Sequence, residues 1–220
     1  MDKTNKGSFK NNWKNFWSKK TFKIQLPLTI VMLFLTLHFF AQLLIFIEQR
    51  PGVVLNDPIL NLFNPVRLDW IIFSLIYLSI LTGLIFLLKY PQYFLVAIQT
   101  YILMNLFRMI SMYVVPLAPP LGTLDLMDPL IFVVGTGTPI TKDLFFSGHT
   151  ETMFLLSLTA VNKKMKIVFL ISTFLVGFLV ILQKAHYTID VIAAPFYAYC
   201  SYKIIYSLQK KLMPEYFKDR

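Results

Sequence analysis

The sequence is poor in cysteine and in acidic residues. Cys200 is the only cysteine among 220 residues, which excludes an intrachain disulfide and a cysteine-based metal site. The 11 Asp and Glu are outnumbered by 21 Lys and Arg, so the net charge is +10. A basic balance is also typical of nucleic-acid-binding proteins, but here the basic residues are confined to tails and to short loops between apolar runs. We therefore predict no nucleic-acid partner.

The sequence also lacks internal repeats and any stretch with the composition of a soluble domain. Hydrophobic residues make up 56% of the chain, which is typical of a multi-pass membrane protein. The first apolar run is too long for a signal peptide, and no small-residue cleavage site follows it. We predict a basic cytosolic tail at residues 1–23, a membrane catalytic domain at 24–208 and a cytosolic C-terminal tail at 209–220.

The apolar runs predict an all-α membrane protein, a bundle of six transmembrane helices joined by polar or proline-rich connections. The predicted spans are Leu26–Ile47, Trp70–Leu88, Tyr93–Val115, Thr150–Val161, Ile167–Leu182 and Val191–Leu208.

Charge predicts the orientation of these spans. With a cytosolic N-terminus, sixteen of the 21 Lys and Arg lie on the cytosolic side. Only Arg50, Arg67, Lys142 and Lys184 lie on the opposite side, and Arg108 lies inside the third span. Because basic residues concentrate on the cytosolic side of membrane proteins, we predict that both termini are cytosolic.

Two short polar stretches interrupt the apolar sequence, and each contains a histidine. His149 begins the fourth predicted span and His186 precedes the sixth, so both are expected on the exoplasmic side. Thirteen residues separate His149 from Asn162, or about 20 Å of helix. Against a hydrocarbon core of about 30 Å, His149 would lie near the lipid headgroups. Ionisable groups at this depth indicate function, and the depth suits a lipid substrate.

The spacing of these residues suits chemistry on phosphorus. His186 and Asp190 are four residues apart, so on a helix they share one face. The carboxylate can hold the imidazole in one tautomer and leave the other ring nitrogen as a nucleophile. His149 then serves as general acid and base. Arg108 is predicted to bind the phosphate, because a guanidinium grips phosphate oxygens with two hydrogen bonds.

Three alternative interpretations remain open at this point. Two histidines and one carboxylate are also a ligand set for iron or zinc, although Arg108 would repel a cation. Arg108 itself is interpretable as a structural residue that extends its charge toward the membrane surface. Glu151 is expected to face the aqueous cleft beside His149, with no assigned role.

The motifs resemble those of the sphingomyelin synthase family, a branch of the type 2 phosphatidic acid phosphatase superfamily. Asp143 followed by Ser147-Gly148-His149-Thr150 is similar to one family motif, and His186-Tyr187-Thr188-Ile189-Asp190-Val191 is similar to another. Arg108 with Ser111–Val114 resembles the third-helix motif, and Asp57 carries a weaker similarity in the first outer loop.

The resemblance implies a reaction and a set of roles. A phosphocholine or phosphoethanolamine group would pass from a glycerophospholipid, through a phosphohistidine, to ceramide or a diacylglycerol-type acceptor, without cofactor or metal. It implies that His186 is the nucleophile, Asp190 its partner and His149 the proton-transfer residue. Arg108, Ser147 and Gly148 are predicted to bind phosphate, with Tyr187, Asp143 and Glu151 in support.

Some residues depart from the family pattern. Thr141-Lys142 replaces the usual Cys-Gly before the motif aspartate, and Pro195 replaces a tyrosine. The alternative function is a lipid phosphate phosphatase of the wider superfamily, with water as acceptor. That branch usually carries Lys-x6-Arg-Pro and a proline before Ser-Gly-His. Neither is present here, and Phe146 occupies the proline position. A non-catalytic lipid-binding protein ranks last.

The basic N-terminal tail predicts a further partner. Its lysines, with Trp13 and Trp17, are expected to lie against anionic lipid headgroups. The sequence predicts no particular oligomeric state.

Overall fold

The long helices of this protein arise from the apolar runs and their flanking polar residues. The computed structural model describes residues 9–124, 126 and 140–217. Within these ranges the regular structure is helical, apart from one isolated bridge between Val53 and Leu117. The helices are α1 Phe9–Trp17, α2 Lys20–Gln49, η1 Leu60–Leu62, α3 Asp69–Leu87, α4 Pro91–Val114, α5 Gly148–Thr159, α6 Lys163–Leu182, α7 Thr188–Leu212 and η3 Pro214–Tyr216.

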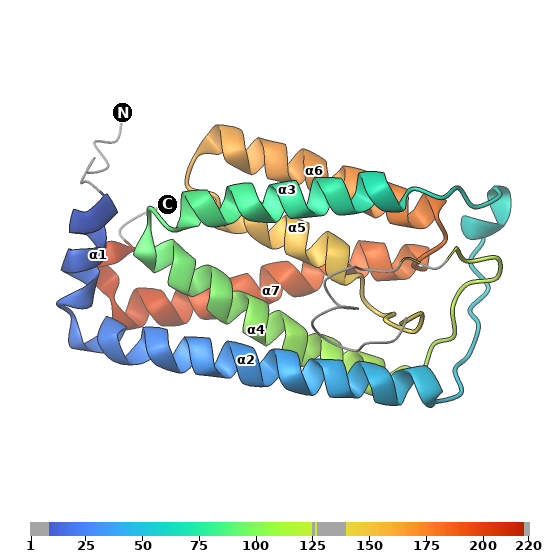
Figure 1. Ribbon diagram of the computed structural model, residues 1–220, viewed down its shortest axis with the longest axis horizontal. Coiled ribbons are helices and arrows are strands. Elements are labelled where there is room, and N and C mark those ends of the chain that lie inside the picture. Colours follow the sequence, from blue (N-terminus) through green and yellow to red (C-terminus); the bar gives the residue numbers. More distant parts are fainter. Residues whose placement is uncertain (1–8, 125, 127–139, 218–220) are drawn as a thin grey trace.

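The long helices α2 to α7 run side by side along one axis and form a bundle (Figure 1). The described parts of both terminal segments, α1 and η3, lie at one end of the bundle. The connection between α2 and α3, the start of α5 and the start of α7 lie at the other end. The two histidine motifs therefore share the end opposite to the terminal segments.

Each predicted span overlaps one helix of the bundle, which confirms the all-α fold. Four helices, α2, α3, α4 and α6, are long and apolar enough to cross a membrane. Helix α5 has only 12 residues, about 18 Å, against a hydrocarbon core of about 30 Å. Helix α7 has 25 residues but carries Asp190 and several tyrosines near its start and middle. The six-span count and the orientation remain predictions.

Polar side chains set the starts of the helices that carry the motifs. The hydroxyl of Ser147 accepts a hydrogen bond from the backbone N–H of Thr150 and so caps α5. Asn162 caps α6 in the same way through Lys164. At α7, the Asp190 carboxylate reaches back to the backbone N–H of Tyr187 at 3.2 Å. These caps fix where His149 and His186 stand at the ends of their helices.

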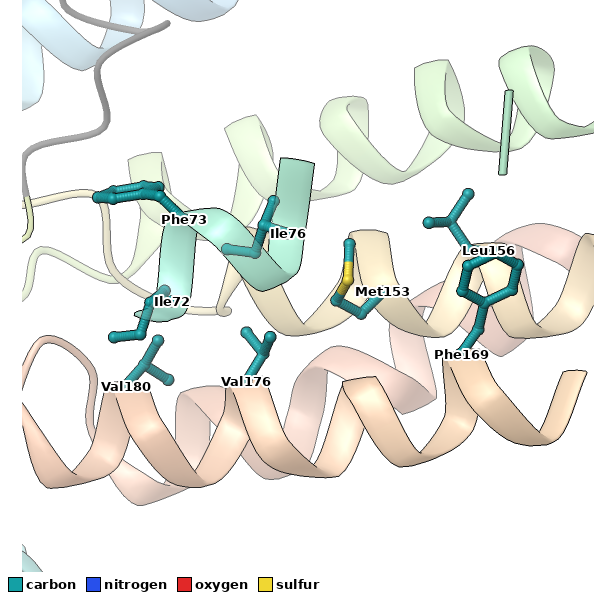
Figure 2. Close-up of a cluster of buried hydrophobic side chains, with 8 residues drawn as sticks. All are labelled: Ile72, Phe73, Ile76, Met153, Leu156, Phe169, Val176 and Val180. Atoms are coloured by element: carbon teal, nitrogen blue, oxygen red, sulfur yellow. The ribbon is translucent and has the colours of Figure 1, made fainter. Parts of the chain in front are cut away.

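A core of apolar side chains holds α5 between α3 and α6 (Figure 2). Met153 and Leu156 of α5 pack against residues from the two neighbouring helices, namely Ile72, Phe73, Ile76, Phe169, Val176 and Val180. Gly177 of α6 lets the neighbouring α7 approach closely, because a Cβ atom there would lie 2.8 Å from a Val191 methyl group. The packing makes α5 and α7 a rigid support for the histidines.

Candidate active site

The structure brings the two histidine motifs together. The backbone N–H of Ser147 donates a hydrogen bond to the carbonyl oxygen of Asp190 at 3.1 Å, which ties the start of α5 to the first turn of α7. The rings of His149 and His186 meet edge to face, with centroids 5.9 Å apart. Phe73 of α3 lies edge-on to His149 at 6.0 Å. The two imidazoles thus lie against each other at this end of the bundle.

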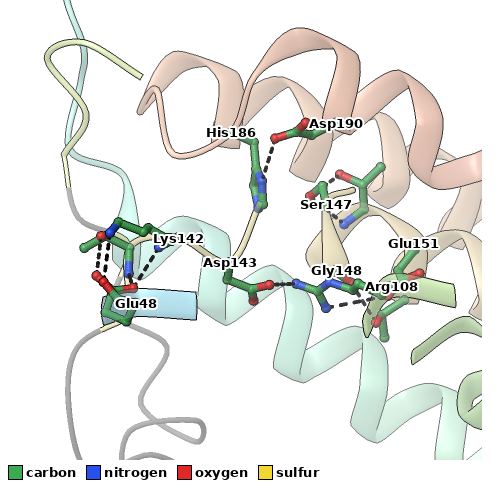
Figure 3. Close-up of polar contacts among 12 residues, drawn as sticks. Glu48, Arg108, Lys142, Asp143, Ser147, Gly148, Glu151, His186 and Asp190 are labelled. Atoms are coloured by element: carbon green, nitrogen blue, oxygen red, sulfur yellow. Dashed lines mark hydrogen bonds and ion pairs between the residues drawn. The ribbon is translucent and has the colours of Figure 1, made fainter. Parts of the chain in front are cut away.

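His186 is paired with Asp190 as the spacing predicts. Its Nδ1 lies 3.5 Å from Oδ2 of Asp190, and both side chains are almost completely buried (Figure 3). This separation is that of an ion pair and exceeds a hydrogen bond, and such contacts commonly tighten when a substrate binds. Because Nδ1 faces the carboxylate, Nε2 is the ring nitrogen left for chemistry.

Arg108 of α4 is buried and held by two carboxylates. Its Nη2 lies 2.5 Å from Oδ1 of Asp143, and its Nη1 lies 3.6 Å from Oε1 of Glu151. The guanidinium carbon also lies 5.1 Å from the centre of the Phe40 ring. Figure 3 shows Asp143 and Glu151 approaching the guanidinium from different directions. The predicted phosphate-binding arginine is therefore already partnered.

The position of Arg108 requires a glycine at residue 148. A Cβ atom at residue 148 would overlap the guanidinium of Arg108. Since Gly148 is the first residue of α5, the guanidinium lies against the helix N-terminus. Backbone N–H groups at a helix N-terminus favour anions. The charge of the guanidinium beside them is balanced by Asp143 and Glu151.

Glu151 does not face an aqueous cleft, contrary to the prediction. Its side chain is 1% exposed and lies beside Arg108. Residue 151 is on the first turn of α5, and the packing of α5 against α4 turns this face toward the guanidinium. A carboxyl group buried at such a position needs a polar partner, and the group that it contacts is the Arg108 guanidinium.

Ser147 and Tyr187 have structural partners. The Ser147 hydroxyl accepts from Thr150 Oγ1 at 3.1 Å, in addition to capping α5. The Tyr187 hydroxyl donates to the carbonyl of Ala118 at 2.8 Å and accepts from the backbone N–H of Leu55 at 3.1 Å. Tyr187 therefore joins the connection after α2 and the segment after α4 to the His186 motif.

Asp57 is a second anchor of α7. Its carboxylate accepts hydrogen bonds from the backbone N–H of Thr188 at 2.7 Å, from the Thr188 hydroxyl at 3.1 Å and from the N–H of Ile59 at 3.0 Å. Burial raises the pKa of this carboxyl, but the hydrogen bonds from Thr188, Leu60 and Ile59 outweigh burial and hold the pKa below 3.8. The weak similarity in the first outer loop thus marks a residue that fixes the helix start after His186.

Sequence reasoning missed a group of contacts around Glu48, at the end of α2. The carboxylate of Glu48 accepts from the N–H of Thr141 at 2.9 Å, from the Thr141 hydroxyl at 2.6 Å and from the N–H of Lys142 at 3.0 Å. The Lys142 ammonium donates to the carbonyls of Glu48 at 2.8 Å and Arg50 at 2.7 Å (Figure 3). We call these five bonds the Glu48 clasp.

The Glu48 clasp holds the residue before Asp143 and so sets where Asp143 meets Arg108. Arg50 extends the arrangement, because its guanidinium donates to the carbonyls of Tyr113 and Met112 at the end of α4, each at 2.8 Å. One feature of the sequence could have pointed to the Glu48 clasp. Thr141-Lys142 is the departure from the resembled motif, and these two residues supply the donors to Glu48.

The described residues contain no group of three or more His, Cys, Asp or Glu side chains arranged to hold a metal ion. His149, His186 and Asp190 are close, but Arg108 with its two acids adjoins them on the α5 side. The arrangement places two imidazoles, one of them backed by a carboxylate, beside the N-terminus of α5.

Comparison with known families bears on the segment that holds both motifs. Residues 142–208 match the family model described as PAP2 superfamily C-terminal. This segment includes α5, α6 and most of α7, less than a third of the chain. The match supports a relationship to the type 2 phosphatidic acid phosphatase superfamily, whose enzymes act on phosphoesters, without distinguishing its sphingomyelin synthase branch. No curated protein matches the sequence.

The PAP2-superfamily match and the apolar helices together support a membrane lipid enzyme that acts on phosphoesters. The individual roles assigned to His149, His186, Asp190 and Arg108 stay predictions, as do Ser147 and Gly148 as phosphate ligands. The exoplasmic placement of the site likewise stays a prediction.

Proposed function

We propose that this protein is a lipid headgroup phosphotransferase of the sphingomyelin synthase type. It would move a phosphocholine or phosphoethanolamine group from a glycerophospholipid to the hydroxyl of ceramide or a similar lipid. The observation that carries the proposal is the arrangement of His186, backed by Asp190, facing His149 beside the start of α5.

In the first step, Nε2 of His186 attacks the phosphorus of the donor. A P–N bond forms and the P–O bond to the glycerol carbon chain breaks, which releases diacylglycerol. Protonated His149 gives its proton to the departing oxygen. The Asp190 carboxylate stabilises the positive charge on the His186 ring while the phosphoryl group is attached.

In the second step, neutral His149 takes the proton from the acceptor hydroxyl. The acceptor oxygen attacks phosphorus, the P–N bond breaks and His186 is regenerated. The charge on the phosphoryl oxygens is greatest in the transition states, where the helix N-terminus at Gly148 and the guanidinium of Arg108 would stabilise it.

A phosphate at Arg108 would join two carboxylates that already contact the guanidinium. Asp143 contacts Nη2 and Glu151 contacts Nη1. Asp143 is 16% exposed, whereas Glu151 is 1% exposed, so Asp143 is the carboxylate that can yield to an incoming phosphate. We therefore assign Glu151 to holding Arg108 in place and Asp143 to exchange with substrate.

Burial of the nucleophile favours a lipid acceptor over water. His186 and Asp190 are 3% and 0% exposed, so bulk water has poor access to a phosphohistidine at this position. A lipid phosphate phosphatase would use the same nucleophile with water as acceptor, and the reaction products separate the two functions.

The test is a reconstitution of the full-length protein with labelled phosphatidylcholine, phosphatidylethanolamine and phosphatidic acid, with and without ceramide. Mass spectrometry is expected to find a phosphosphingolipid only when ceramide is present, together with diacylglycerol. Release of inorganic phosphate from phosphatidic acid, with no ceramide-dependent product, would refute the transferase and favour the phosphatase.

Substitution of His186 tests the proposed mechanism separately from the substrate. His186→Ala is expected to lower turnover at least 10³-fold, because both steps pass through this ring. His38→Ala, on the lipid-exposed face of α2, removes a histidine outside the site and is expected to keep near-wild-type turnover. Equal activity of the His186→Ala protein and the wild type would contradict phosphohistidine chemistry.

A further inference from the structure

The end of the bundle opposite the candidate active site carries a short helix that does not run with the others. Figure 1 shows α1 crossing this end of the bundle, whereas α2 to α7 run along its axis. If the long helices cross a membrane, α1 lies in the plane of the membrane surface. Helices that lie in this plane place aromatic residues toward the lipid and lysines at the headgroups.

Contacts with two other parts of the chain fix α1 in this position. The Trp13 indole N–H donates to the carbonyl of Leu88 at 2.7 Å, and the Asn12 amide donates to the carbonyl of Lys89 at 3.1 Å. The buried ring of Phe16 lies 3.9 Å from the ring of Tyr216, centre to centre. Helix α1 is thus joined to the turn between α3 and α4 and to the C-terminal segment.

An open groove of about 460 Å³ lies between α1 and the start of α2. It is lined by Trp13, Lys14, Trp17, Ser18 and Lys23. Both lysines are exposed, Trp17 is 47% exposed, and no carboxylate lines this groove. A groove with two ammonium groups, a hydroxyl and two indole rings suits a ligand that has an anionic head and an apolar body.

The depth of the groove corresponds to the headgroup region. Lys23 and Glu48 are both on α2 and are 25 residues apart, or about 38 Å of helix. A bilayer measures about 30 Å across its hydrocarbon core and about 40 to 45 Å with its headgroups. With Glu48 near one surface, Lys23 stands at the headgroup level of the other.

We infer that this groove binds an anionic phospholipid of the leaflet around α1. The lipid phosphate lies between Lys14 and Lys23, and the start of its acyl chains packs on Trp13 and Trp17. A zwitterionic headgroup is a poorer ligand, because its ammonium would enter a region that already holds two lysines. The inference does not depend on the proposed transferase activity, since the groove and the candidate active site lie at opposite ends of the bundle.

Tryptophan fluorescence gives a direct test, because the chain has only three tryptophans. Trp70, at the start of α3, is 88% exposed and would also contact lipid, so the test uses the Trp70→Phe protein in nanodiscs. The remaining fluorescence comes from Trp13 and Trp17. Lipids brominated near the headgroup quench a nearby indole. We expect half-maximal quenching at a much lower mole fraction of brominated phosphatidylglycerol than of brominated phosphatidylcholine.

Substitution of Lys14 and Lys23 tests whether their positive charge determines the binding of anionic lipid. Lys14→Gln with Lys23→Gln is expected to raise the half-saturating fraction of phosphatidylglycerol roughly 25-fold, at about fivefold per lysine near a charged surface. The matched control is Lys163→Gln with Lys164→Gln, at the exposed start of α6, which removes the same charge outside the groove. It is expected to leave the quenching curve unchanged.

Three outcomes would overturn the inference. Equal quenching by both brominated lipids would show that the groove has no preference for anionic lipid. Equal weakening in the two double variants would show a diffuse effect of net charge without a site. Free inorganic phosphate is expected to leave the quenching unchanged, and displacement of the lipid by phosphate alone would show that the groove binds the anion without its apolar body.

Discussion

At the scale of single residues, the candidate site depends on a few contacts between ionisable side chains. His186 depends on Asp190 for its orientation, and Arg108 depends on Asp143 and Glu151 for compensation of its buried charge. A buried guanidinium without carboxylates, or carboxylates without a guanidinium, costs several kcal/mol. The same pairing leaves the arginine in a fixed position at the start of α5, where a phosphate would lie.

Gly148→Ala tests this position. The added Cβ atom would overlap the guanidinium, so Arg108 has to move away from the helix N-terminus. We expect kcat/KM for lipid transfer to fall at least tenfold and the melting temperature to fall as well, because a guanidinium displaced from its buried ion pairs costs several kcal/mol. The matched control is Gly83→Ala, where the new Cβ meets only the flexible end of the Leu156 side chain. Comparable activity of the two variants would contradict the role of Gly148.

The Asp57→Asn variant tests the anchor at the start of α7, because Asp57 should make the stability of the protein depend on pH. Because hydrogen bonds hold the folded pKa of Asp57 below 3.8, its contribution to stability is present above that value and lost as pH falls through the lowered pKa. Thermal unfolding between about pH 2.5 and 6 should show the wild type more stable than Asp57→Asn at the upper end, with the difference shrinking at the lower end. A difference that grows as the pH falls would contradict this account.

At the scale of secondary-structure elements, the Glu48 clasp connects the end of α2 to the segment before α5. The contacts join residues more than 90 positions apart and include two backbone N–H groups. This segment has no helical hydrogen bonds of its own, so the carboxylate of Glu48 supplies the acceptors that fix it. Asp143 follows immediately and reaches Arg108 from this fixed point.

Glu48→Ala is expected to release residues 141–143 while the helical bundle remains folded. Removing the acceptors should raise hydrogen exchange at the amides of Thr141 and Lys142 by at least tenfold, since a hydrogen bond to a charged group contributes about 1.5 to 3 kcal/mol. Transfer activity should fall mainly through KM, because Asp143 and Arg108 lose their alignment. Glu215→Ala, an exposed carboxylate at the opposite end, is the control and should change neither quantity.

At the scale of the whole molecule, the arrangement places the candidate active site and the α1 groove at opposite ends of one bundle. Within the described residues, four helices are apolar enough to cross a membrane, and α5 is too short to do so alone at full thickness. The predicted topology, with His149 at the start of the short α5, puts this histidine near the level of the headgroups, where a phospholipid carries its phosphate.

Accessibility of single cysteines tests this topology, and the chain offers a simple background because Cys200 is its only cysteine. In Cys200→Ala, cysteines are introduced at the exposed positions Asn61, Leu121, Lys164 and Lys210. With six spans and cytosolic termini, a membrane-impermeant maleimide should label positions 61 and 121 in intact cells. Positions 164 and 210 should require permeabilisation. Labelling of 121 and 164 from the same side would contradict a spanning α5.

Much of the architecture was predictable because it depends on local sequence. Apolar runs long enough for helices, ended by polar or proline-containing stretches, predict α2 to α7 with boundaries wrong by only a few residues at most ends. The spacing of His186 and Asp190 predicts their contact, because residues four apart on a helix share a face. Helix α1 was not predicted, since nine residues within a polar tail give too weak a pattern.

The sequence by itself determined the long helices, the histidine motifs and the pairing of His186 with Asp190, because each depends on residues a few positions apart. Tertiary structure decided which side chains meet between helices. It buried Glu151 against Arg108, gave Asp143 the same partner and joined Glu48 to Thr141 and Lys142. Helical periodicity shows that a residue belongs to one face of its helix, but the neighbour of that face is set by the packing of the whole bundle.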